Sequence, residues 1–88
     1  MKRYRYILNG RVQGVGFRYR SQIAANKYNL TGSVKNRDDE SVELIVQGDD
    51  IKIKNFLEDL KNQRFIKING ISKEELDLVD ESKFIIKY

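Results

Sequence analysis

The chain has 88 residues, of which 34% are charged and 40% hydrophobic, and this balance predicts one folded domain over residues 1–88 rather than disorder. It contains no cysteine and no histidine, which excludes disulfides, thiolate and imidazole nucleophiles and most zinc sites. The net charge of +4 favours an anionic partner such as phosphate or nucleic acid, although a solvated basic surface explains it equally well.

The first predicted elements are a strand, a glycine-rich loop and a helix. Residues 3–12 are rich in Tyr, Ile, Leu and Val, and one side of the predicted strand holds Tyr4, Tyr6 and Leu8. Three glycines follow within seven positions, at Gly10, Gly14 and Gly16. Apolar residues then recur at helical spacing from Phe17 to Tyr28, and Asn29 is expected to end this helix in a left-handed conformation.

A hairpin and a second helix come next. The segments 30–36 and 42–47 are predicted as strands joined by the polar run 37–40. The stretch Gly48-Asp49-Asp50 offers an N-cap for a helix, and the apolar residues that follow it lie at i, i+3, i+4 and i+7, namely Ile53, Phe56, Leu57 and Leu60.

The last third of the chain has a weaker pattern. Residues 62–73 show no clean period, whereas 74–79 and 83–88 are predicted as strands. The order β-α-β-β-α-β, with room for an added terminal strand, predicts an α+β fold. This is the ferredoxin-like split βαβ sandwich, in which an antiparallel sheet has two helices on one face. The short apolar stretch Ile7-Leu8 is far from a signal-peptide core or a membrane span, so a cytoplasmic location is expected.

The candidate site is the segment Gly10–Arg18, between the first strand and the first helix. Backbone N–H groups of a glycine turn can converge on an anion, and the start of a helix adds unpaired donors. Arg18, at the end of the loop, can add two charge-assisted hydrogen bonds to the same anion. The segment is neither a Walker A loop nor a dinucleotide fingerprint, and a plain glycine turn is the alternative interpretation.

These residues resemble the acylphosphatase family, whose signature G-x-V-Q-G-V-x-F-R is present without a break from Gly10 to Arg18. The resemblance extends over nearly the whole chain and includes Ala25, Leu30, Gly32, Val34, Asn36, Val42, Glu43, Gly48, Phe84 and Tyr88. It implies hydrolysis of the carboxyl–phosphate bond of an acyl phosphate, without metal or cofactor, to carboxylate and inorganic phosphate. It also implies that the loop backbone and Arg18 bind the phosphoryl group, at Gln13, Gly14, Val15, Gly16, Phe17 and Arg18. Asn36 would then orient the attacking water.

Two positions depart from the family pattern. Ser33 replaces the usual aromatic residue, which predicts looser packing beside Asn36. The segment after the second helix lacks the family's Gly-Pro loop, since the chain has no proline, and this leaves the preferred acyl group open.

Several alternatives remain at this stage. A non-catalytic phospho-ligand domain would keep the same anion site, and an RNA-binding module would use the basic aromatic strand 3–6. Asn36 would instead cap a turn if the loop had no function. The run Asp38-Asp39-Glu40 and the pair Asp49-Asp50 match no metal-binding pattern and are expected at a hairpin tip and a helix cap. We expect a monomer without metal, membrane or nucleic-acid partner.

Overall fold

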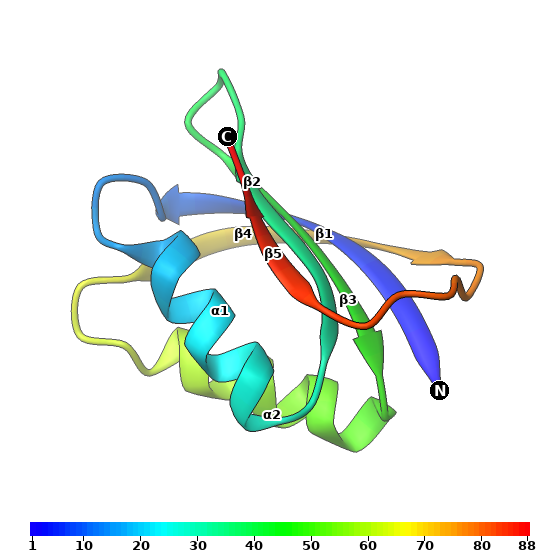
Figure 1. The fold of residues 1–88 in the computed structure, drawn as a ribbon. Helices are drawn as coiled ribbons and strands as arrows, with labels where there is room; N and C mark the ends of the chain where they lie inside the picture. The colour runs from blue at the N-terminus through cyan, green and yellow to red at the C-terminus, as the bar shows by residue number, and fades with distance from the viewer.

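Seven elements follow one another in the computed structural model, which describes residues 1–88. They are β1 (Lys2–Arg11), α1 (Phe17–Lys27), β2 (Thr31–Asn36), β3 (Val42–Gly48), α2 (Asp50–Lys61), β4 (Lys67–Leu76) and β5 (Phe84–Lys87). The strands form one sheet, and both helices cover the same face of it (Figure 1). The predicted α+β ferredoxin-like fold is therefore confirmed. Neither helix is long and apolar enough to cross a membrane.

The sheet has the order β4-β1-β3-β2-β5 and is mixed rather than purely antiparallel. Neighbouring strands are antiparallel from β4 to β2, as expected, but β5 runs parallel to β2. The prediction of an antiparallel sheet is thus wrong for this last strand. Its physical cause is the path of residues 77–83, which cross the end of the sheet so that β5 starts beside the start of β2 (Figure 1).

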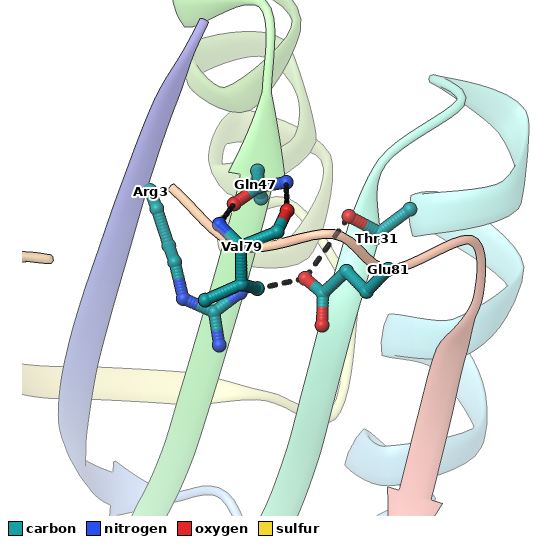
Figure 2. Close-up of polar contacts among 5 residues, drawn as sticks. All are labelled: Arg3, Thr31, Gln47, Val79 and Glu81. Atoms are coloured by element: carbon teal, nitrogen blue, oxygen red, sulfur yellow. Dashed lines mark hydrogen bonds and ion pairs between the residues drawn. The ribbon is translucent and has the colours of Figure 1, made fainter. Parts of the chain in front are cut away.

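Polar side chains on three strands fix this crossing segment (Figure 2). The Gln47 side chain donates to the Val79 carbonyl at 2.8 Å and accepts from the Val79 N–H at 3.0 Å. Glu81 accepts hydrogen bonds from Arg3 at 2.6 Å and from Thr31 at 3.0 Å. Because the backbone of Val79 pairs with a side chain, residues 77–79 leave the sheet, and the strand predicted over 74–79 is wrong at both ends.

The fourth strand begins at Lys67, inside the segment whose apolar pattern has no clean period. It pairs with β1 over most of its length, but the register shifts between Asn9 and Gly10. A shift of one residue moves side chains to the opposite face of a strand, so a single alternation cannot extend through the whole segment.

The core lies between the helices and the sheet. Tyr4, Tyr6 and Leu8 of β1 are at most 6% exposed, as the packing interpretation predicted, so the rings of the first strand form no open platform for stacking. They belong to a cluster of 17 buried residues that includes Val42, Leu44 and Val46 of β3 and Ile53, Phe56 and Leu60 of α2. The predicted helix boundaries also hold: Asn29 is left-handed with φ 56°, and the Asp49 side chain accepts from two backbone N–H groups of α2.

Candidate active site

The loop from Val12 to Gly16 joins β1 to α1 and is held at both ends by the core. Val12 is fully buried and Phe17, the first residue of α1, is 2% exposed. Between them, Gly14 and Gly16 have φ of +73° and +74°, a conformation that costs glycine little and other residues more. The backbone N–H groups of residues 13–16 donate to no protein acceptor. The loop therefore presents a set of free donors, as an anion-binding backbone concavity does.

The start of α1 adds positive charge beside this loop. The first N–H groups of a helix have no partner within it and lie at the positive end of the helix dipole. The first turn of α1 contains no acidic residue, and Gly16 supplies no side-chain cap. Arg18 and Arg20 lie in this turn instead, although cations there oppose the helix dipole. A bound anion would satisfy the donors and relieve this repulsion.

Gln13 is the residue whose role the sequence did not reveal. Its side-chain amide donates to the carbonyl of Arg37 at 2.9 Å and to that of Ser41 at 2.8 Å. These two carbonyls lie at the neck of the hairpin between β2 and β3, where the Arg37 N–H also donates to Ser41. The Gln13 side chain thus ties the loop to the hairpin and leaves only its backbone N–H free for an anion. The contact spans 24 positions of sequence, so no local pattern could have indicated it.

Arg18 lies on the opposite side of the loop, against β5. Its Nη1 donates to the Lys87 carbonyl at 3.4 Å, and its guanidinium carbon is 4.8 Å from the centre of the Tyr88 ring. The side chain is half-buried. These contacts orient the planar guanidinium at the mouth of the loop and leave the remaining N–H groups for a ligand.

Asn36, at the end of β2, has the one buried side-chain polar atom without a hydrogen-bond partner, its Oδ1. The alternative prediction, that it caps the turn, is wrong, because the cap is Asp39. The Asp39 carboxylate accepts from the hydroxyl and the N–H of Ser41, and these hydrogen bonds lower the pKa of Asp39 below its ordinary value. An unpaired buried acceptor costs about 1–3 kcal/mol, which a water or ligand at the site would recover.

A pocket of about 280 Å³ brings these groups together. Its lining includes most of the predicted site, namely Gln13, Gly14, Gly16, Phe17, Arg18 and Asn36, together with Val12, Tyr19, Ile86 and Tyr88. Val15, the remaining predicted residue, packs its side chain against the core and does not line the pocket. Two other hollows are larger: one of about 460 Å³ beside α2 contains none of the predicted residues, and one of about 370 Å³ at the hairpin between β2 and β3 contains only Asn36 among them. We therefore place the candidate active site at the smaller pocket.

The chain is similar to known proteins over nearly its whole length. A family model described as Acylphosphatase matches residues 4–86. An acylphosphatase of Bacillus licheniformis is 46% identical over 90 aligned residues, with 100% of both chains covered. The crystal structure of an acylphosphatase from Bacillus subtilis superposes with a TM-score of 0.92 at 46% identity and also covers 100% of both chains. That of an acylphosphatase from Coxiella burnetii gives a TM-score of 0.88 at 30% identity, covering 98% of this chain and 92% of the other.

Proposed function

The chain belongs to the acylphosphatase family, and we propose that Arg18 and the loop 13–16 bind the phosphoryl group of its substrate while Asn36 places the attacking water. Its relatives identify it as a hydrolase that acts on acyl phosphates, with a carboxylate and inorganic phosphate as products. The roles of individual residues are the proposed part, and they are argued from the pocket.

Binding uses the free donors of the loop and the charge of Arg18. Two or three phosphoryl oxygens would accept from the backbone N–H groups of residues 13–16 and from the first N–H groups of α1. The guanidinium of Arg18 would donate two parallel hydrogen bonds to the same group. In phosphoryl transfer, negative charge spreads over the three equatorial oxygens, so fixed donors in this position stabilise the transition state.

The chemical step requires little beyond orientation. Water attacks phosphorus in line with the bond to the acyl oxygen, that bond breaks, and its electron pair leaves with the carboxylate. A carboxylate is a good leaving group, so holding the reactants in line can supply most of the acceleration. No side chain that lines the pocket is a carboxylate, histidine or lysine, and we therefore assign the proton of the water to an oxygen of the phosphoryl group itself.

The unpaired Oδ1 of Asn36 is the observation that best supports this function. It is a buried acceptor that borders the same pocket as Arg18 and the loop, and a water donating to it would stand beside a bound phosphoryl group. A non-catalytic phosphate-binding domain would gain nothing from such an acceptor, because phosphoryl oxygens do not donate unless protonated.

Hydrolysis in water enriched in oxygen-18 tests this assignment. With benzoyl phosphate as substrate, attack at phosphorus places the label in inorganic phosphate, and we expect it there. Label in the benzoate would mean attack at the acyl carbon, and the proposed role of Asn36 would then be abandoned.

We also propose that the protein acts as a single-domain monomer in the cytoplasm, without a metal or cofactor. All groups that the mechanism uses belong to one chain, and all but Val15 of the loop line one pocket. The absence of cysteine suits a reducing compartment.

A further inference from the structure

Two tyrosines stand at the mouth of the pocket, and the mechanism above gives neither of them a contact with the substrate. Tyr19, in the first turn of α1, is 64% exposed, and Tyr88, which follows β5, is 93% exposed. Both line the pocket, together with the half-buried Ile86. The two rings come from opposite parts of the chain, so the fold, not local sequence, gathers them at this mouth.

The pocket is too small to enclose a large acyl group together with the phosphoryl group. Its volume of about 280 Å³ falls below the range of about 300–1,000 Å³ that is usual for drug-sized ligands. With the phosphoryl group at the loop, an acyl group larger than acetyl must extend outward past the two rings.

The chemistry of the lining restricts what can lie there. Arg18 is its one charged side chain, and in the proposed mechanism this side chain binds the phosphoryl group. A charged acyl group would find no further partner, whereas an uncharged aromatic group would find Ile86 and two ring faces or edges. Aromatic rings attract one another in offset or edge-to-face arrangements, beyond the effect of buried area.

We propose that Tyr19 and Tyr88 form an acyl-binding subsite that selects acyl phosphates with an uncharged aromatic acyl group over those with a small aliphatic one. This inference rests on the proposed function, because it takes the loop and Arg18 as the phosphoryl site. Tyr19 touches the acyl group alone. Tyr88 has two roles, since its ring also stacks against Arg18.

The test compares phenylphosphonate with methylphosphonate, two stable ligands that share the charged group and differ in the organic one. Affinities are measured by calorimetry for the wild type, Tyr19→Ala, Tyr88→Leu and the control Phe65→Ala. Phe65 is an exposed aromatic residue, 53% accessible, outside this pocket.

Tyr19→Ala should lower the affinity for phenylphosphonate about threefold to tenfold and change the affinity for methylphosphonate by less than about twofold. Tyr88→Leu should weaken both ligands, and phenylphosphonate more, while Phe65→Ala should affect neither. Equal effects of Tyr19→Ala on both ligands, or no effect on either, would overturn the subsite.

The ratio of kcat/KM for benzoyl phosphate over that for acetyl phosphate provides the matching kinetic readout, and Tyr19→Ala should lower it by a similar factor. If the protein binds the phosphonates with the predicted selectivity but hydrolyses neither substrate, the proposed function is wrong and the subsite stands. Turnover with an unchanged ratio would remove the subsite alone.

Discussion

Replacing Asn36 by alanine should lower the activity and leave the stability almost unchanged. The Asn36 side chain makes no hydrogen bond within the protein, and its Oδ1 is buried. Because water in the pocket can donate to this oxygen, removing it should recover at most about 1 kcal/mol, and losing the packing of a half-buried amide should cost about 1 kcal/mol. We expect the free energy of unfolding to stay within about 1 kcal/mol of the wild type. For an 88-residue domain this corresponds to a change of less than about 5 °C in melting temperature.

Activity should fall in the same variant, because the water loses the acceptor that places it. A misplacement of about 1 Å at a reacting centre can cost about 100-fold in rate, and we expect at least that loss in kcat. Affinity for inorganic phosphate should stay close to that of the wild type, since Arg18 and the loop remain.

Thermal unfolding and benzoyl phosphate hydrolysis measure the two effects, with Asn55→Ala on the exposed side of α2 as the matched control. That control should leave kcat unchanged. A drop of about 5 °C or more in the melting temperature of Asn36→Ala would show that Asn36 stabilises the hairpin. A kcat within about threefold of the wild type would refute its role toward water.

Three further changes test the scaffold. Gln13→Ala removes two hydrogen bonds between the loop and the hairpin, and it should lower the free energy of unfolding by about 1–3 kcal/mol in urea and also weaken phosphate binding. Unchanged phosphate affinity would mean that the loop keeps its shape without that tie. Asp49→Ala removes the N-cap of α2 and should cost about 1 kcal/mol with kcat unaltered; a selective loss of kcat would contradict this. Burial raises the pKa of Tyr6 from 10.0 to about 12, so the unfolded state releases this proton first, and stability should fall as pH rises from 10 to 12. Urea titrations across that range should show that the free energy of unfolding falls less in Tyr6→Phe than in the wild type. An equal fall in both would mean that other groups cause the loss of stability at high pH.

The parts of the fold that follow local rules could be predicted from the sequence. Alternation predicted β1, helical spacing and a cap within residues 48–50 predicted α2, and the glycines predicted the loop between β1 and α1. Each depends on residues within a few positions of one another. The direction of β5 could not be predicted in this way, because it depends on Gln47 and Glu81, which hold residues 77–83 across the end of the sheet.

The site shows the same division. Its free backbone donors and its arginine lie in one short segment, so the sequence alone could suggest an anion site there. The side-chain contacts of Gln13 and Tyr88 were not predictable, because their partners lie far away in the sequence, at the neck of the hairpin and in the first turn of α1. The unpaired oxygen of Asn36 is visible only once the burial of that atom is known.

The most direct test of the central claim is the rate of benzoyl phosphate hydrolysis by the wild type and by Arg18→Ala, with EDTA present. Arg64→Ala is the matched control, because it removes the same charge from an exposed position outside the pocket. The proposed mechanism predicts wild-type turnover unaffected by EDTA, a loss of about 100-fold or more in kcat/KM for Arg18→Ala, and little change for Arg64→Ala. Equal rates for Arg18→Ala and the wild type, or activity that EDTA abolishes and magnesium restores, would contradict it.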